Sequence, residues 1–129
     1  MVLINNSEDP VKKYLRTADT YHNNALELFG RREFRKAGEL LWGAVTQRIK
    51  AVAAVRGIQI QNHNEFFNFM REVTREIENP ELYQTFLDLN ALHKNFYDQI
   101  IPETDFQIYI QRVTEFERMI DELLKEIIK

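Results

Sequence analysis

The stretch DFQIYIQRVTEFERMIDELLKEIIK, residues 105–129, has the regular pattern that decides the fold class. Its apolar residues recur every three or four positions, which places them along one side of an α-helix. They are Phe106, Tyr109, Ile110, Val113, Phe116, Ile120, Leu123, Leu124 and Ile127. Mostly polar and charged residues lie between them, so the stretch predicts a long amphipathic helix with one face turned toward a core.

The same spacing of apolar residues, every three or four positions, recurs in four segments that precede this one. Between Pro10 and Gly30, apolar residues from Val11 to Leu28 predict a first helix. The other three predicted helices are Glu33–Arg56, Asn64–Glu78 and Glu81–Gln99, bounded by Gly57, Pro80 and Pro102. Helices joined by short connections run back beside one another. We therefore predict an all-α protein, a five-helix antiparallel up-and-down bundle.

Length and composition agree with one helical domain. A chain of 129 residues buries roughly two thirds of the surface that its unfolded form exposes. Apolar residues make up 44% and charged residues 29%, as in folded globular proteins. We expect a single domain over residues 1–129, in which residues 1–9 form a flexible or loosely packed arm.

Several classes of protein are excluded or disfavoured by what the sequence lacks. It has no cysteine, which excludes disulfides and thiolate metal sites. No stretch reaches the eighteen or so apolar residues of a membrane span, and the start MVLINNSEDP lacks the features of a signal peptide. We expect a cytoplasmic protein without a membrane partner.

Charge is distributed unevenly along the chain. Residues 31–56 hold seven basic and two acidic residues, whereas residues 65–105 hold three basic and nine acidic residues. Arg31, Arg32 and Arg35, with Lys36, stand at the start of the second predicted helix, where the helix dipole favours an anion. They are candidate ligands for a phosphate group. Pairing with the acidic segment is the alternative interpretation.

His93 stands in the stretch LNALHKNFYDQ, residues 89–99, on or beside an apolar stripe. The spacing of Leu89, His93 and Phe96 is helical, so one interpretation is a histidine at the core edge bonded to a neighbouring helix. The alternative is a functional pocket. Its predicted lining residues are His93, Tyr97, Arg48 and Trp42.

Arg56 and His63 are separated by six residues and lie at the end of one predicted helix and the start of the next. As structural residues, the arginine would favour the helix dipole and the histidine would cap a helix. As catalytic residues, His63 would act as acid or base on a ribose hydroxyl and Arg56 would stabilise phosphate charge.

Metal and cofactor chemistry have little support in the sequence. The three histidines, His22, His63 and His93, lie on different segments, and neither an HExxH motif nor a glycine-rich phosphate loop is present. We expect no bound metal or cofactor. The run HNN, residues 22–24, is interpreted as polar helix surface.

Two stretches resemble a known superfamily. The stretch AGELLWGAVTQRIKAVAAVRGIQIQNHNEFFNFMREV, residues 37–73, is similar to the HEPN superfamily, in which a long helix ends in an arginine-glycine turn and a histidine opens the next helix. Those positions are Arg56, Gly57 and His63. The stretch NALHKNFYDQII, residues 90–101, is similar to an archaeal, PaREP-type branch of that superfamily.

The resemblance implies a helical bundle that pairs as a dimer or with a small nucleotidyltransferase. Some members are metal-independent ribonucleases in which four to six polar or mixed residues separate an arginine from a following histidine. At that distance before His93 the chain has Phe86, Leu87 and Asp88, and no arginine.

From these observations we expect a homodimeric, non-catalytic binding or assembly module that binds a nucleotide or RNA. The expected dimer contact is either the small-residue face of residues 33–56 or the apolar C-terminal helix. A metal-independent ribonuclease and a regulatory partner of a nucleotidyltransferase are the alternatives.

Overall fold

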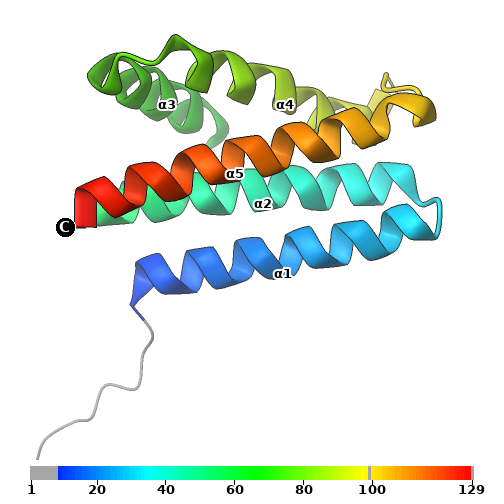
Figure 1. Cartoon of the computed structure of the whole chain (residues 1–129), viewed down its shortest axis with the longest axis horizontal. Helices are drawn as coiled ribbons and strands as arrows, with labels where there is room; N and C mark the ends of the chain where they lie inside the picture. The colour runs from blue at the N-terminus through cyan, green and yellow to red at the C-terminus, as the bar shows by residue number, and fades with distance from the viewer. Residues whose placement is uncertain (1–8, 99, 129) are drawn as a thin grey trace, which may run out of the picture.

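The computed structural model describes residues 9–98 and 100–128, and within these ranges the chain is helical without any strand (Figure 1). The helices are α1 (Pro10–Gly30), α2 (Phe34–Val55), α3 (His63–Ile77), α4 (Pro80–Asp98), the short 3-10 helix η1 (Glu103–Asp105) and α5 (Phe106–Ile128). The predicted all-α helical bundle is confirmed. The expected N-terminal arm lies outside the described residues except for Asp9, and so does Gln99, the predicted end of the fourth helix.

Side-chain caps explain why three of the helices begin where they do. The Asp9 carboxylate accepts a hydrogen bond from the Val11 amide at 2.8 Å, and Pro10 occupies the first position of α1. The Asn79 side chain accepts one from the Glu81 amide at 3.2 Å at the start of α4. The start of α3 is capped by Asn62, as described with the site.

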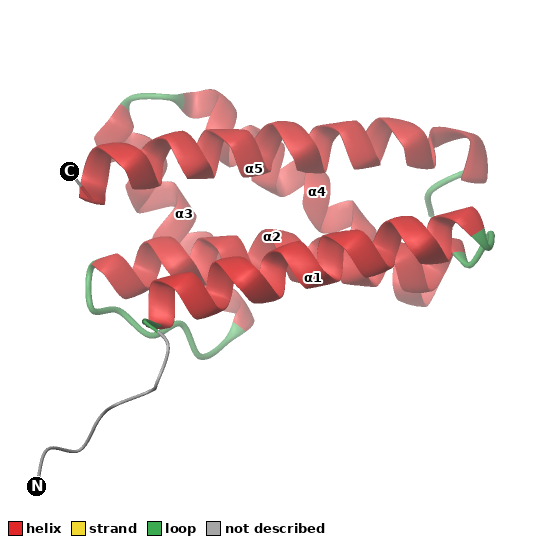
Figure 2. Ribbon diagram, turned by 60° about the horizontal axis from the view of Figure 1, so that its bottom comes forward, coloured by secondary structure: helices red, strands yellow, loops and turns green. Residues whose placement is uncertain are grey.

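The helices pack around one continuous core. α1 lies antiparallel against α2, and α4 and α5 lie against α2 and against each other (Figures 1 and 2). The largest fully buried side chains come from α2, α3, α4 and α5 and include Leu41, Met70, Phe86, Phe106 and Phe116. Within the described residues, no helix combines the length and the apolarity that crossing a membrane requires.

α3 departs from strict alternation because it runs in the same general direction as α2. The ammonium of Lys50 lies 5.9 Å from the Phe66 ring, and Arg56, further along α2, reaches Glu76, further along α3. The connecting residues 56–62 return along α2 and bury Ile60. Seven residues can span about 23 Å when extended, so the connection is long enough for this return.

The small residues of α2 serve packing inside the chain. A Cβ on Gly43 would lie 2.9 Å from Cδ2 of Tyr21 in α1, and one on Gly38 would lie 3.1 Å from Cζ of Phe106 in α5. The apolar stripe of α5 is also buried, with Phe106, Val113 and Phe116 fully enclosed. Both surfaces expected to form a dimer contact are therefore occupied by the chain's own helices.

Candidate functional site: a histidine cluster beside a basic corner

Five side chains from three helices meet at one place, and we call them the histidine cluster. The members are Glu39, Trp42, His63, His93 and Tyr97. The ring of His93 stacks on Trp42 with centroids 6.1 Å apart, lies 5.8 Å from the ring of His63, and meets Tyr97 edge-on at 5.6 Å. Trp42 is buried, whereas Tyr97 is 66% exposed, so the cluster runs from the core to the surface.

A carboxylate orients the central imidazole. Nδ1 of His93 lies 3.0 Å and 3.1 Å from the two carboxylate oxygens of Glu39, and both side chains are about one third exposed. This bond fixes the orientation of the His93 ring, and the second ring nitrogen, Nε2, remains to hydrogen-bond another group. Sequence reasoning missed Glu39. The available signal was a single acidic residue inside the apolar run AGELLW.

His63 is held by the cap of α3, of which it is the first residue. The Asn62 side chain accepts a hydrogen bond from the Glu65 amide at 3.1 Å, and the Glu65 carboxylate accepts one from the Gln61 amide at 2.6 Å. This arrangement is similar to a capping box, except that the Glu65 carboxylate bonds the amide of the residue before the N-cap Asn62. It fixes the backbone on both sides of His63.

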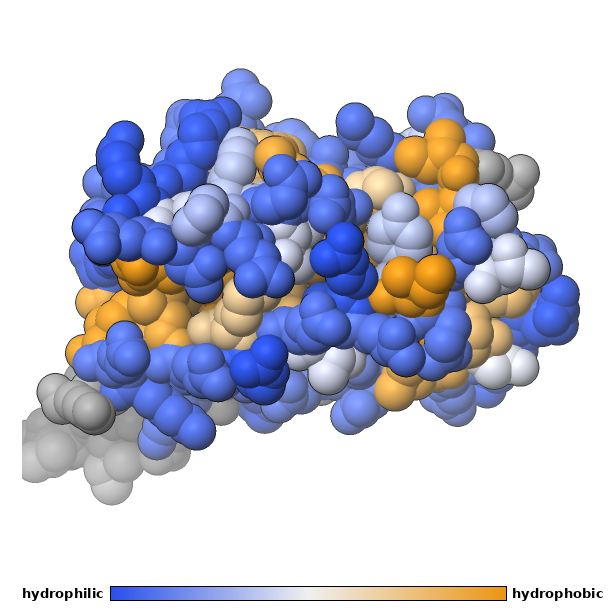
Figure 3. All heavy atoms as spheres, turned by 45° about the horizontal axis from the view of Figure 1, so that its top comes forward, coloured by the Kyte–Doolittle hydropathy of each residue, from blue (hydrophilic) through white to orange (hydrophobic). Residues whose placement is uncertain are grey.

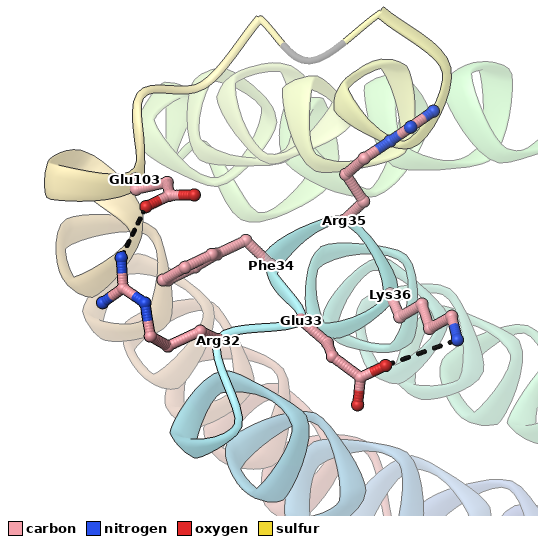
Figure 4. A pocket seen from close by; sticks show the side chains of 6 residues that line it. All are labelled: Arg32, Glu33, Phe34, Arg35, Lys36 and Glu103. Atoms are coloured by element: carbon pink, nitrogen blue, oxygen red, sulfur yellow. Dashed lines mark hydrogen bonds and ion pairs between the residues drawn. The ribbon is translucent and has the colours of Figure 1, made fainter.

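The basic corner consists of Arg31, Arg32, Arg35 and Lys36, at the turn between α1 and α2. Arg32 pairs with Glu103 at 2.8 Å, and Lys36 pairs with Glu33 at 3.4 Å (Figure 4). Arg31 pairs with Glu27 at 3.4 Å. A pocket of about 300 Å³ opens here, and its lining residues are Arg32, Glu33, Phe34, Arg35, Lys36 and Glu103. The pairing of Arg32 with Glu103 is the pairing with the acidic segment that the sequence offered as an alternative.

Arg35 connects the basic corner to the histidine cluster. Its side chain extends to the end of α4, where it donates hydrogen bonds to the backbone carbonyl of Phe96, including one from Nε at 2.8 Å. A further bond from Nη2 reaches the carbonyl of Tyr97 at 3.5 Å. The cations of the corner and the rings of the cluster therefore adjoin, and we call the combined surface the cationic–aromatic strip.

Arg48 does not lie in the pocket predicted from the sequence. It follows Trp42 by six positions, or about 240° around the helix, so it faces a different side of α2. There it is buried and pairs with Asp19 of α1 at 3.0 Å and with Asp121 of α5 at 3.4 Å. Trp42, His93 and Tyr97 do converge as that interpretation supposed.

Arg56 and His63 are not brought together. Arg56 pairs with Glu76 at 2.6 Å, and its guanidinium lies 5.7 Å from the ring of Phe69. These two residues follow His63 in α3 by thirteen and six positions, which correspond to about 20 Å and 9 Å along the helix. The ring of His63 instead lies against the rings of Phe67 and His93, with centroids 4.9 Å and 5.8 Å away.

The HNN run suggested that His22 lies on the polar surface of its helix, but the side chain is largely buried. Its Nδ1 lies 2.9 Å from the Glu117 carboxylate, and the two side chains are 16% and 11% exposed. The hydrogen bond to Glu117 raises the pKa of His22, and burial opposes that rise. The signal for this pair was absent from the local sequence, because the two residues lie on opposite ends of the chain.

The structure shows no preformed metal-binding site within residues 9–98 and 100–128. There, no group of three or more histidine, aspartate or glutamate side chains is placed to hold a metal ion. The histidine cluster offers hydrogen bonding, stacking and proton transfer.

The fold and the site together define an all-α bundle with a cationic–aromatic surface at the junction of three helices. Comparison with known families assigns this bundle further: residues 13–117 match the archaeal PaREP1/PaREP8 family. The match extends from α1 into α5 and includes both the basic corner and the histidine cluster, and the chain belongs to this family. No curated protein matches the chain.

Proposed function

We propose that this protein is a module that binds a nucleotide or single-stranded RNA on the cationic–aromatic strip. The observation that carries the proposal is the bond from Arg35 to the end of α4, because it sets phosphate-binding side chains beside stacking rings. Proteins bind single strands by this combination of a basic surface and aromatic side chains on which bases stack.

The two parts of the strip are accessible. Tyr97 is 66% exposed, and His63, which lies on another side of His93 in the cluster, is also exposed. At the corner, the side chains of Arg32 and Lys36 are 74% and 68% exposed despite their ion pairs. Exposed ion pairs contribute little to stability, so a phosphate could replace Glu103 or Glu33 as partner at small cost. Glu33 also provides no side-chain cap for α2, whose first amides favour an anion.

Fluorescence anisotropy with a labelled single-stranded oligoribonucleotide tests the proposal. We expect Tyr97→Ala to weaken binding about tenfold, since stacking one base contributes about 1–3 kcal/mol. Replacing Arg31, Arg32 and Arg35 together with Gln should weaken binding further and flatten its salt dependence. Arg118→Gln removes a cation of a similarly exposed α5 ion pair, and it serves as the control. Wild-type protein that binds no RNA at low salt, or a triple variant that binds normally, would contradict the proposal.

Ribonuclease activity is the second candidate, and the pair of His63 and His93 favours it. One imidazole could remove the proton of a ribose 2′-hydroxyl as its oxygen attacks phosphorus, and the other could protonate the departing 5′-oxygen. Glu39 would then position His93. Cleavage of RNA in the presence of a chelator, lost in both His63→Gln and His93→Gln, would support this function. Binding without cleavage would leave the non-catalytic proposal standing alone.

Self-association is proposed through a groove between α4 and α5, in place of the two buried surfaces. The groove measures about 550 Å³, and Leu87 and Ile108 at its sides are 39% and 55% exposed. Asp88 and Arg112 form an ion pair across it at 3.2 Å. A two-fold contact requires a surface that complements itself, and this groove has apolar groups and both charges. A small nucleotidyltransferase, implied by the HEPN resemblance, is the alternative partner.

The α3–α4 side of the molecule offers less to a partner. Figure 3 shows the molecule with its α3–α4 side brought forward, and apolar side chains there form patches separated by hydrophilic residues. Patches of limited size are ordinary on monomers, so the groove is the better candidate for self-association.

A further inference from the structure

We propose that a buried ion cluster between α1, α2 and α5 makes the attachment of α1 pH-dependent, with α1 held when His22 is protonated and released when it is neutral. The cluster consists of Asp19, His22, Arg48, Glu117 and Asp121. It lies on the opposite side of α2 from the histidine cluster and takes no part in the proposed binding.

The cluster joins two helices whose backbones are not closely packed against each other. α1 packs along α2, and its contact with α5 depends on side chains. One link is direct, from His22 to Glu117 at 2.9 Å. The other passes through Arg48, which lies 3.0 Å from Asp19 and 3.4 Å from Asp121.

The direct link is the part of the cluster that a proton controls. Glu117 is 11% exposed, and the guanidinium of Arg48 approaches it only to 4.0 Å. With His22 protonated, the cluster holds two cations and three carboxylates. When His22 is neutral, Arg48 alone faces three carboxylates, and Glu117 remains buried with its nearest charge partner lost.

The other charged groups that face His22 act in opposite directions. Asp19 on its own helix favours the protonated form, and Arg48 on α2 disfavours it. The bond to Glu117 on α5 outweighs burial, so the pKa of His22 is raised. The closed cluster therefore keeps His22 protonated to a higher pH than an ordinary histidine, and raising the pH through this pKa weakens the link to Glu117.

The consequence of release is local. Tyr21, next to His22, fills the space above Gly43 of α2, and Ala18 and Ala25 are fully buried on the same side. When the link to Glu117 weakens, these contacts remain the main attachment of the middle of α1. Brief separation of α1 would then expose apolar surface of α2 while α3 and α4 stay packed.

Hydrogen–deuterium exchange at pH 6, 7.5 and 9 tests this proposal on the wild-type chain. After correction for intrinsic exchange, we expect amides in the middle of α1 to exchange several-fold faster at pH 9 than at pH 6, and those of α4 to stay constant. A parallel NMR titration should give His22 a pKa above the ordinary histidine value of about 6.5. Equal behaviour of α1 and α4 across the pH range would overturn the proposal.

Two variants distinguish an effect of His22 protonation from an effect of side-chain packing. His22→Gln keeps a side chain that can donate to Glu117 but cannot titrate, so its α1 exchange should be independent of pH. Glu117→Gln should lower the pKa of His22 and remove the pH dependence in the same way. His63→Gln is the matched control, since that histidine lies outside the ion cluster, and it should retain the wild-type response. A pH response that persists in His22→Gln would also overturn the proposal.

Discussion

Burial separates the charged residues that can affect stability from those that cannot. Arg31 and Glu27 form an ion pair with both side chains about two thirds exposed, and such pairs contribute roughly 0–1 kcal/mol. The pair of His22 and Glu117 is more than four fifths buried, so its charge state matters for folding. The exposed pair and the buried pair have similar N–O distances, but only the buried pair is expected to affect folding stability strongly.

The stability of the protein should depend on pH through His22. Its folded pKa is raised, so its stabilising contribution is complete below the unfolded value of about 6.5 and is lost as pH rises through the folded value. Urea unfolding of wild type and His22→Gln, measured between pH 5.5 and 9, should show wild type losing its advantage with increasing pH. An advantage that is constant over this range would contradict the assignment.

Gly43→Ala should destabilise the protein by about 1–2 kcal/mol. The new Cβ would lie 2.9 Å from Cδ2 of Tyr21, near the base of the ring, and such overpacking exceeds the roughly 1 kcal/mol that alanine adds to helix propensity. Gly30→Ala is the control, because nothing lies within 4 Å of a Cβ at that position. Urea unfolding should find Gly30→Ala as stable as wild type or more stable.

At the level of elements, helix ends place the candidate site. α2 supplies Glu39 and Trp42, α4 supplies His93 and Tyr97, and only the start of α3 brings His63 to them. The position of His63 therefore depends on the cap formed by Asn62 and Glu65. A change in this cap should alter both stability and the site.

Asn62→Ala should reduce stability by about 1 kcal/mol, because the amide of Glu65 loses its acceptor. The same change should broaden or shift the NMR signals of His63, which the cap holds. Asn64→Ala, at an exposed position within α3, should change stability by less than about 0.5 kcal/mol. Thermal unfolding of the two variants makes the comparison, and equal losses would exclude the capping role.

Glu78→Gly should stabilise the protein by about 0.5–1 kcal/mol. Glu78 ends α3 in the left-handed conformation, with φ of 54°, which disfavours a residue with a Cβ and suits glycine. Glu72→Gly, at an exposed position inside α3, should have the opposite effect and cost about 1 kcal/mol. Urea unfolding that shows Glu78→Gly to be destabilising would contradict this reading of the turn.

At the scale of the whole molecule, the remaining question is which surface can meet a second chain. Burial of the small-residue face of α2 and of the α5 stripe leaves the α4–α5 groove as the proposed contact. Sedimentation velocity should then detect a species of twice the 15.4 kDa chain mass.

A charged residue at the groove should abolish that species. Leu87→Glu or Ile108→Glu places a carboxylate in the apolar part of the contact, where it would lose its water. Leu26→Glu, at another exposed apolar position, is the control and should leave association unchanged. A wild-type protein that sediments as a 15.4 kDa monomer at high concentration would rule out self-association.

The sequence by itself determined the helices. The apolar period of three to four residues, with proline and glycine near the ends, set the five α-helices, and their described bounds agree within a residue or two, whereas the short 3-10 helix η1 was not predicted. These signals are local, because the hydrogen bonds and caps of a helix involve residues close together in the chain. The sequence offered the convergence of Trp42, His93 and Tyr97 as one of two interpretations, and that interpretation also included Arg48, which lies elsewhere.

Only the tertiary structure decided the partners of the charged and titratable side chains. Glu39 meets His93, His22 meets Glu117, and Arg48 meets Asp19. These pairs depend on the rotation of each helix about its axis and on the return of residues 56–62 along α2. Both are settled by the packing of side chains across the whole core, and periodicity within one helix contains no information about them.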